Sequence, residues 1–434
     1  MNGREMEKRL QELIPGGAHT YSKGADQFPS NAPKVITHGK GVYIYDVDGK
    51  TYLDWCMGLY SVLFGHAYEP VVRRVREQLE KGTNFQRPAI EELELAEMLT
   101  DIIPCADMVK FAKNGSTVTT AAFKLARAYT GKEKIAICAE HPFFSYDDWF
   151  IGSTPCAEGI TESEKRLSVK FKYNDLESVR KVFKEHRGNV AALILEPMKF
   201  EEPKDDFLHE VQALCKENGT VFILDEMITG FRFPLGGAQK YFDIEPDLTT
   251  FGKAVANGFS MAFLAGKREI MEMGGIEPGK KKVFLVSTTH GAETHSLVAA
   301  MATIEELRNK KVIDHLWNVG EQFLQKVPAI AQEIGLSDYV GITGHKYLPL
   351  MTFKDHSKED SLGFKTLFMQ ELVKRGILFQ GMFVSAYMHT QKDIDRTLDA
   401  IKESLQVYRK AIDAKTYRDL LEGDPIKPVF RRVN

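Results

Sequence analysis

Two uninterrupted apolar runs, residues 190–195 and 221–224, constrain the fold of this 434-residue chain most strongly. The first run ends at Glu196 and the second at Asp225, and a helical pattern over 207–217 lies between them. Strands that are apolar on both faces belong in the interior of a sheet that is covered on both sides, and the connection between two such strands is almost always right-handed. The sequence therefore predicts a parallel β-α-β unit at the centre of an α/β fold.

The composition is that of a globular protein and argues against several classes of function. With 43% apolar and 27% charged residues, the 434-residue chain can bury the cores of two or more domains. A net charge of −3 argues against a nucleic-acid or membrane partner, and no apolar run approaches the ~20 residues of a membrane span. Five cysteines without a Cys-x-x-Cys pair, and histidines without ligand spacing, predict reduced thiols in a cytoplasmic protein that holds no metal.

The character of the chain changes along its length, which predicts three segments. Residues 1–65 contain an amphipathic helix, a polar arm and a β-hairpin with an Asp-Gly turn. Residues 66–305 alternate helices with apolar strands, as in a large domain with a mostly parallel sheet. Residues 306–434 mix helices with a few strands. We expect the two outer segments to form a smaller α+β domain built from both termini.

One carboxylate and one lysine stand out in the central segment. Asp225 ends a buried strand, where open α/β sheets bind ligands, and Met227 shares its face two residues on. Lys253 lies within 251–256, a run of small and apolar residues that would exclude water and lower its pKa. Pyridoxal phosphate requires such a pair, a lysine for the Schiff base and an acid for the pyridinium nitrogen. Taken singly, each has a common structural explanation, because acids cap helices and most lysines are solvated surface charges.

A candidate phosphate loop, Gly115, Ser116 and Thr117, lies between a predicted strand and a predicted helix. The first amides of a helix have no internal acceptor, and the helix dipole favours an anion there. An ordinary N-cap by serine or threonine explains the same residues. Residues 287–291 are a second hydroxyl-rich stretch that could reach a phosphate, or an ordinary polar loop. The sequence contains no Walker loop, no G-x-G-x-x-G and no H-E-x-x-H.

Together these motifs resemble those of the fold-type I, class III aminotransferases, the group that includes glutamate-1-semialdehyde aminomutase. The similarity covers nearly the whole chain and is most specific over 224–232 and 246–253. It implies the aminotransferase fold, with a large, mostly parallel domain and a smaller α+β domain. It also implies pyridoxal 5′-phosphate as the cofactor, with Lys253 as the Schiff-base residue and Asp225 holding the pyridinium nitrogen protonated.

The resemblance assigns further roles around the cofactor. Gly115, Ser116 and Thr117 would hold the phosphate, and Met227 would pack on the ring. Thr289 would reach the phosphate of the partner subunit, so the active unit would be a homodimer with shared active sites.

Two departures from the family pattern concern the cofactor ring. Glu140 stands where the family has a ring-stacking aromatic residue, followed by the retained His141. Phe143 or Phe144 would then stack on the ring, or the loop is remodelled. We expect His141 and Phe143 to contact the cofactor.

Other departures concern the substrate. Ser22 and Lys23 lie in the stretch that replaces the aminomutase's N-terminal arginine segment, and Glu293 lies in the stretch that replaces a Gly-Asn-Pro after Thr289. We expect Ser22, Lys23 and Glu293, together with Glu140, to contact the substrate.

The sequence therefore predicts a pyridoxal-phosphate-dependent aminotransferase that takes its amino group from an amino-acid donor, with glutamate favoured. By analogy with a branch of the family, the carbonyl acceptor would be a sugar-like or secondary-metabolite intermediate. The main alternative is an intramolecular aminomutase on the same scaffold. A cofactor-binding protein that has lost transamination is a third, and the presence of both Lys253 and Asp225 argues against it.

Overall fold

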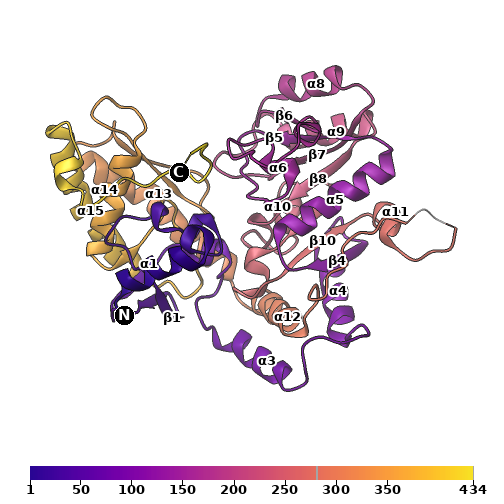
Figure 1. Ribbon diagram of the computed structural model, residues 1–434, viewed down its shortest axis with the longest axis horizontal. Helices are drawn as coiled ribbons and strands as arrows, with labels where there is room; N and C mark the ends of the chain where they lie inside the picture. The colour runs from indigo at the N-terminus through magenta and orange to yellow at the C-terminus, as the bar shows by residue number, and fades with distance from the viewer. Residues whose placement is uncertain (280–281, 434) are drawn as a thin grey trace. The chain divides into compact units, whose positions relative to one another are not determined.

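The computed structural model describes residues 1–279 and 282–433, which form two compact units (Figure 1). Unit 1 comprises residues 1–68 and 314–431. Unit 2 comprises residues 69–313 and the end of the chain.

Unit 2 is built on a seven-stranded sheet. Its strands follow the spatial order β4 (Met108–Ala112), β10 (Ala262–Gly266), β9 (Leu248–Phe251), β8 (Val221–Asp225), β7 (Val190–Leu195), β5 (Lys134–Cys138) and β6 (Ser168–Phe171). All neighbours are parallel except β10, which runs antiparallel to both β4 and β9. Because β10 runs antiparallel to both of its neighbours, β4 runs in the same direction as β9 and the other four parallel strands. The carboxyl end of β4 therefore lies at the same edge of the sheet as theirs.

The predicted β-α-β unit is confirmed. Strands β7 and β8 are parallel neighbours in which Leu195 pairs with Leu224, and α9 (Phe207–Glu217) connects them. All residues of both strands are buried, which explains why their sequences show no alternation. The predicted α/β class with a mostly parallel sheet is therefore correct.

The two faces of this sheet carry different helices (Figure 1). Helix α9 and α8 (Leu176–Glu185) pack in one core cluster with Leu193, Leu195, Phe222 and Leu224. Since side chains alternate along a strand, Ile223 and Asp225 point to the other face. Helix α5 (Gly115–Thr130) packs against β7 to β10. The remaining α-helices of unit 2 are α3 (Glu69–Leu79), α4 (Ile90–Ile102), α6 (Asp148–Ile151), α7 (Glu162–Lys165), α10 (Gly237–Tyr241), α11 (Arg268–Met271) and α12 (Thr294–Asn309).

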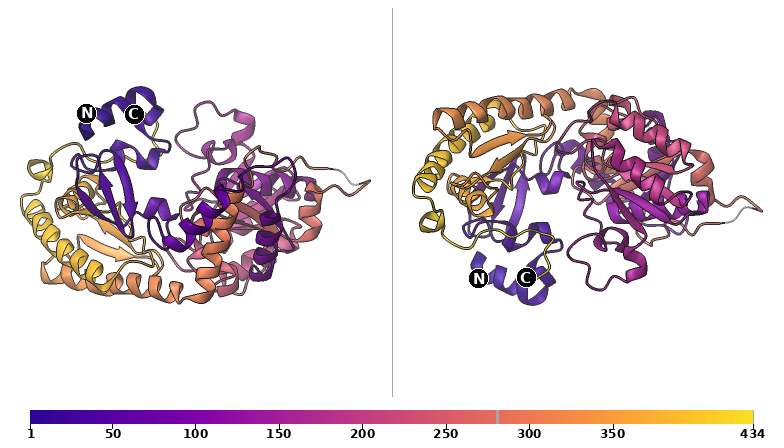
Figure 2. Two further views of the ribbon diagram at one scale, coloured as in Figure 1. Left: turned by 90° about the horizontal axis from the view of Figure 1, so that it is seen from below. Right: turned by 90° about the horizontal axis from the view of Figure 1, so that it is seen from above.

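Unit 1 joins the two ends of the chain in one sheet of order β1 (Ile36–Lys40), β2 (Tyr43–Asp46), β3 (Thr51–Asp54) and β13 (Ile377–Leu378). Strands β2 and β3 form the predicted hairpin, and Gly49 in its turn has a φ of 80°, which glycine adopts without strain. Strand β13 pairs with β3 in parallel. The small sheet β11–β12 (Val340–Thr343, Leu350–Phe353) and helices complete the unit (Figure 2): α1 (Gly3–Leu13), α2 (Met57–Tyr60), α13 (Val312–Glu333), α14 (Leu362–Lys374) and α15 (Gln391–Asp413).

Glu226, next to Asp225, is wholly buried and holds the chain after β8 in place. Its carboxylate accepts hydrogen bonds from the Thr229 hydroxyl and from the backbone amides of Ala238 (2.6 Å) and Gln239 (3.0 Å). We expect Glu226→Ala to lower the free energy of unfolding by about 3 kcal/mol or more, because these buried donors lose their acceptor. Thermal unfolding would measure this, with Glu245→Ala, at an exposed position, as control. An unchanged melting temperature in Glu226→Ala would contradict this role.

None of the described helices is both long and apolar enough to cross a membrane. All five cysteines have free thiols. Within residues 1–279 and 282–433, no cluster of side chains has the composition of a metal site.

Candidate active site

Acidic residues lie at the carboxyl ends of two neighbouring strands, β7 and β8, of the unit 2 sheet. Leu195 pairs with Leu224, so the next residues, Glu196 and Asp225, lie side by side and point to the same face. Both are buried. On the other side of Asp225, strand β9 brings Thr250 into register with it.

The Asp225 carboxylate is held in a fixed orientation. Its Oδ1 atom accepts hydrogen bonds from the Met227 amide (2.9 Å) and from the Thr250 hydroxyl (3.0 Å). Burial and the neighbouring Glu196 charge raise the pKa of Asp225 to about 6. Both hydrogen bonds that the described residues give this carboxylate go to Oδ1, so Oδ2 can accept from a ligand.

Lys253 lies directly beyond β9, in the short helical turn Lys253–Ala256. Its φ of 47° is unusual for a residue with a side chain, and such strain concentrates at functional sites. Burial, followed by the charge of Lys199, lowers the pKa of Lys253 to about 8, while Glu196 and Asp225 act in the opposite direction. A larger fraction of its amine is therefore neutral and nucleophilic at pH 7 to 8 than in an ordinary lysine.

Glu196 also forms a buried ion pair. Its Oε1 lies 2.6 Å from Nζ of Lys199, and the two side chains are only 5% and 7% exposed. The Glu196 amide donates to Nδ1 of His141 (3.0 Å), which places the His141 proton on Nε2. Burial lowers the pKa of His141 to about 4, so this ring is neutral at neutral pH. The site thus contains a neutral imidazole and two carboxylates close to two lysines.

We expect Lys199→Met to shift the titration of Lys253 upward. The ammonium of Lys199 disfavours a second positive charge nearby, and its removal also leaves Glu196 free to stabilise protonated Lys253. The rate at which the cofactor-free protein takes up pyridoxal phosphate should rise with pH, with a midpoint near 8 in the wild type and higher in the variant. Lys204→Met removes an exposed lysine that pairs with Glu201 and is the matched control. An unchanged midpoint in Lys199→Met would contradict the coupling.

The phosphate end of the site is the start of α5. Asn114 is the N-cap, and its side chain accepts from the Thr117 amide (2.9 Å) and hydroxyl (3.0 Å). The N-cap is therefore asparagine and neither Ser116 nor Thr117. The amides of Gly115 and Ser116 have no acceptor among the described residues, and the Ser116 hydroxyl accepts from the Tyr146 amide (3.1 Å). Two unsatisfied amides at the positive end of a 16-residue helix suit a phosphate.

Met227 connects this helix with the lysine loop. A Cβ atom at Gly115 would lie 3.2 Å from the Met227 sulfur, and one at Gly252 would lie 2.7 Å from it. Both glycines therefore lie close to the end of the Met227 side chain. This contact brings the helix start, the end of β8 and the residue before Lys253 together.

Two further predicted site residues of unit 2, Glu140 and Phe143, lie in the loop between β5 and α6. The Glu140 carboxylate accepts from the Tyr173 amide (3.0 Å). Phe143 packs edge-on against Trp149, with ring centres 5.5 Å apart. Glu140 is therefore held by a residue that follows β6, and Phe143 packs against α6.

The predicted residues before α12 form a second group. Glu293 pairs with Lys113 (2.8 Å), which precedes the N-cap of α5. Thr289 is exposed, and its carbonyl accepts from the Asn84 amide group (3.0 Å).

Ser22 and Lys23 belong to unit 1. The Ser22 carbonyl accepts from the side-chain amide of Gln380 (2.8 Å). Lys23 is exposed and lines a cavity of that unit.

Three residues of the candidate site were not predicted from the sequence: Glu196, Lys199 and Thr250. Glu196 carries the same signal as Asp225, an acid directly after a buried apolar strand, and could have been found. Thr250 required the register of β9 against β8. Lys199 required the course of the chain after β7, for which the sequence offers no signal.

The fold and the site define a class of protein. The site offers a strand-end carboxylate, a lysine of lowered pKa and a helix start with unsatisfied amides. Groups of these three kinds suit the pyridinium nitrogen, the aldehyde and the phosphate of pyridoxal phosphate. The residues present therefore fit this cofactor.

Comparisons with known proteins agree. A model of the aminotransferase class-III family matches residues 25–405. Curated relatives include the 3-aminobutyryl-CoA aminotransferase of Cloacimonas acidaminovorans, 32% identical, with 93% of this chain and 97% of that protein covered. The glutamate-1-semialdehyde 2,1-aminomutase 2 of Halalkalibacterium halodurans is 33% identical, with the same 93% and 97% covered. Among solved structures, the FumI protein of Sphingopyxis sp. MTA144 superposes with a TM-score of 0.85 at 24% identity, covering 98% of each chain.

The chain belongs to the class-III aminotransferase family and is a pyridoxal-phosphate-dependent enzyme. The resemblance, the fold type and the cofactor expected from the sequence are thus confirmed.

Proposed function

We propose that the enzyme transfers an amino group from an amino-acid donor, glutamate, to a carbonyl acceptor, with Lys253 as the residue that forms the Schiff base. The observation that carries the proposal is the register of β8 against β9. Asp225 pairs with Thr250, and Lys253 follows three residues later at the same sheet edge. One flat cofactor can therefore contact both groups.

Each residue of this edge would have a distinct task. Oδ2 of Asp225 would accept a hydrogen bond from the ring nitrogen, and the amides of Gly115 and Ser116 would bind the phosphate. When bound, pyridoxal phosphate supplies an electron sink for the carbanion formed at the substrate's amino-bearing carbon. Lys253 would remove the proton from that carbon and return it elsewhere, because its amine is neutral for a large fraction of the time near pH 8. His141 would stay neutral throughout.

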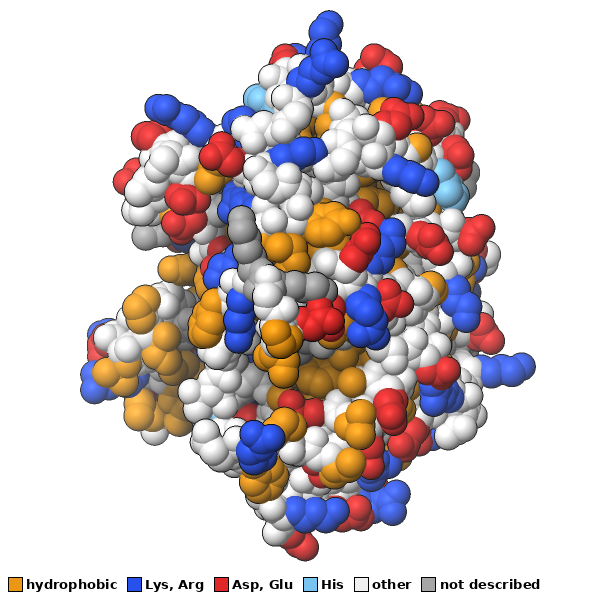
Figure 3. Space-filling model, turned by 90° about the vertical axis from the view of Figure 1, so that its right-hand side faces the viewer, with side chains coloured by type: hydrophobic (Ala, Val, Ile, Leu, Met, Phe, Trp, Pro, Cys, Tyr) orange, Lys and Arg blue, Asp and Glu red, His pale blue; other side chains and the backbone are white. Residues whose placement is uncertain are grey.

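We extend this proposal to a homodimer with shared sites. Thr289 is exposed, as a residue serving a partner subunit must be. Unit 2 also exposes Phe85, Ile90 and Leu93, each more than half accessible. Figure 3 shows apolar side chains that reach the surface between charged ones on one face of the molecule. Sedimentation velocity would test the dimer, and a monomer at micromolar concentration with full activity would contradict it.

The donor is tested by a single-turnover measurement. Mixed with glutamate and no acceptor, the loaded enzyme should release one equivalent of 2-oxoglutarate per active site, because the amino group stays behind on the enzyme. Alanine, which lacks the second carboxylate, serves as the comparison donor. Release from neither donor would rule out transamination from these amino acids.

An aminomutase is the second candidate, because relatives at 33% and 30% identity are named glutamate-1-semialdehyde 2,1-aminomutases. Such an enzyme moves the amino group within one molecule and releases no oxo acid. Turnover of glutamate 1-semialdehyde to 5-aminolevulinate without 2-oxoglutarate release would favour it over the aminotransferase.

A further inference from the structure

Lys113 joins three segments of unit 2 at the phosphate end of the candidate site. It follows β4 directly and precedes Asn114, the N-cap of α5. Its Nζ atom lies 2.8 Å from Oε2 of Glu293, 3.0 Å from Oγ of Ser296 and 3.3 Å from the carbonyl oxygen of Ser260. A lysine ammonium has three protons, so each of them has an acceptor within the protein.

One of these contacts belongs to a link that continues the sheet beyond its last paired residues. Ala112 of β4 pairs with Ala262 of β10, and Lys113 is the next residue of the chain. The Ser260 hydroxyl donates to the Lys113 carbonyl (2.8 Å), while the Lys113 ammonium donates to the Ser260 carbonyl. Ser260 lies in the loop between the Lys253 turn and β10. The segment that leads into α5 is therefore tied to the loop that follows Lys253.

The other two contacts reach the start of α12. Glu293 is the N-cap residue of this helix, and Ser296, in its first turn, is buried. Helix α12 packs in turn against the short helix that begins at Lys253. The hydrogen bond from Lys113 lowers the pKa of Glu293, so the two side chains form an ion pair at neutral pH. One side chain thus connects the start of α5 with two segments that adjoin Lys253.

We propose that Lys113 is a positioning residue that sets the separation between the amides at the start of α5 and the Lys253 side chain. The inference rests on the proposed cofactor contacts of Gly115, Ser116 and Lys253. Pyridoxal phosphate carries its aldehyde and its phosphate arm on neighbouring positions of one ring, so it uses both contacts only when they lie at the matching separation. A ligand held at two points loses affinity when that separation varies, whereas a ligand held at one point does not.

Equilibrium titration of the cofactor-free protein with pyridoxal phosphate and with pyridoxal, which lacks the phosphate, tests this role. Lys113→Met should weaken pyridoxal phosphate binding about tenfold or more, because part of the gain from two-point binding is lost. Its affinity for pyridoxal should stay within about twofold of the wild type, because this ligand has no phosphate contact to lose. The pairing of Ala112 with Ala262 remains, so the variant should fold.

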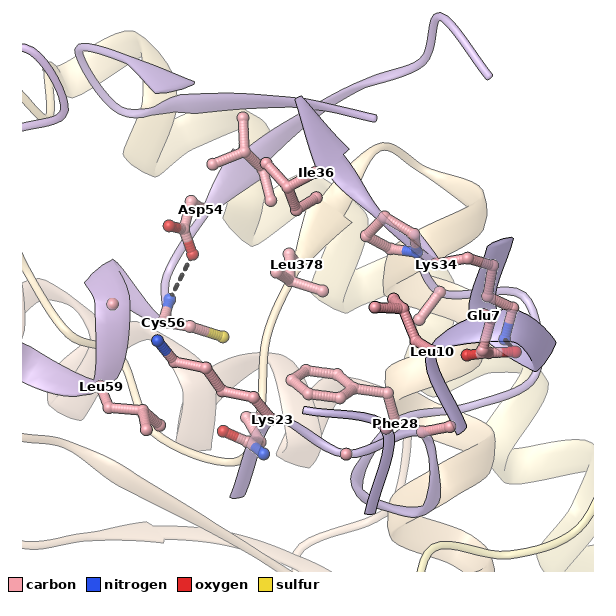
Figure 4. A pocket seen from close by; sticks show the side chains of 18 of the residues that line it. Glu7, Leu10, Lys23, Phe28, Lys34, Ile36, Asp54, Cys56, Leu59 and Leu378 are labelled. Atoms are coloured by element: carbon pink, nitrogen blue, oxygen red, sulfur yellow. Dashed lines mark hydrogen bonds and ion pairs between the residues drawn. The ribbon is translucent and has the colours of Figure 1, made fainter. Parts of the chain in front are cut away.

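Lys34→Met is the matched control. Lys34 pairs with Glu7 in unit 1 (3.3 Å), and Figure 4 shows both side chains. The two side chains of this pair are 15% and 24% exposed, close to the 19% and 22% of Lys113 and Glu293. Lys34→Met should bind both ligands as the wild type does, since it loses a similar ion pair while the contacts within unit 2 stay intact.

A double variant separates position from charge. In Lys113→Met, the carboxylate of Glu293 loses its partner and could repel the phosphate. Lys113→Met/Glu293→Gln removes that charge and should still bind pyridoxal phosphate about tenfold or more weakly than the wild type. Ser260→Ala, at an exposed position, removes only the hydroxyl that donates to the Lys113 carbonyl. It should weaken pyridoxal phosphate binding about threefold, the scale of one hydrogen bond, without affecting pyridoxal.

Equal losses for the two ligands in Lys113→Met, or wild-type affinity for pyridoxal phosphate in the double variant, would overturn the proposal. If Lys113→Met does not fold, Ser260→Ala decides, and unchanged affinities there would overturn it. Equal affinity of the wild type for both ligands would refute the phosphate site itself, and the inference with it. No amino donor takes part in these titrations, so failure of the proposed transamination would leave their result intact.

Discussion

Lys253→Ala is expected to lower the transamination rate by on the order of 10⁴- to 10⁶-fold, the scale of losing a covalent catalytic residue. Asp225 is the buried last residue of β8, and Lys253 supplies the amine of lowered pKa at the same sheet edge. The other lysine near this edge, Lys199, is held in its ion pair with Glu196 and so is a poor substitute. The variant should also retain no cofactor after borohydride reduction and denaturation.

Two controls separate this effect from misfolding. Lys204→Ala removes an exposed lysine of the same unit and should keep full activity. Circular dichroism should show the same helix content in Lys253→Ala and the wild type. Alanine has a Cβ atom, as lysine does, so the steric limits on the backbone at position 253 do not change. Activity within tenfold of the wild type in Lys253→Ala would show that another group performs its task.

Asp225→Asn is expected to slow transamination by about 10²- to 10³-fold, the scale of removing one preorganised electrostatic partner. The amide carries no charge and so cannot hold the ring nitrogen protonated. The wild type should show a related pH effect: the pKa of Asp225 is about 6, so the charged form dominates above that pH. Cofactor affinity should therefore fall as the pH drops below 6, and this fall should be absent in Asp225→Asn.

The neighbouring position provides the contrast. Glu226→Ala should lower the melting temperature, whereas Asp225→Asn should leave the melting temperature of the cofactor-free protein unchanged or higher, because a buried charge is removed. Equal losses of stability in the two variants would indicate that Asp225 is structural as well.

The centre of the fold could be predicted because its signal is local. The runs 190–195 and 221–224 are apolar at every position, and their shortness favours strands buried on both faces over buried helices. The antiparallel insertion of β10 between β4 and β9 could not be predicted, because pairing depends on residues far apart in the sequence. Yet this insertion brings the start of α5 to the edge occupied by Asp225.

The candidate site also has a part that could be predicted from the sequence and a part that could not. Asp225 and Lys253 could be singled out from their neighbours in the chain. The partners that tune them could not, because Lys199 meets Glu196 only through the turn after β7.

The most direct test of the central claim locates the cofactor on the chain. The enzyme loaded with pyridoxal phosphate is reduced with borohydride, digested and mapped by mass spectrometry. We predict one modified peptide per chain, with the phosphopyridoxyl group on Lys253. A modification on Lys199, on another lysine, or on none would contradict the claim that Lys253 is the catalytic lysine.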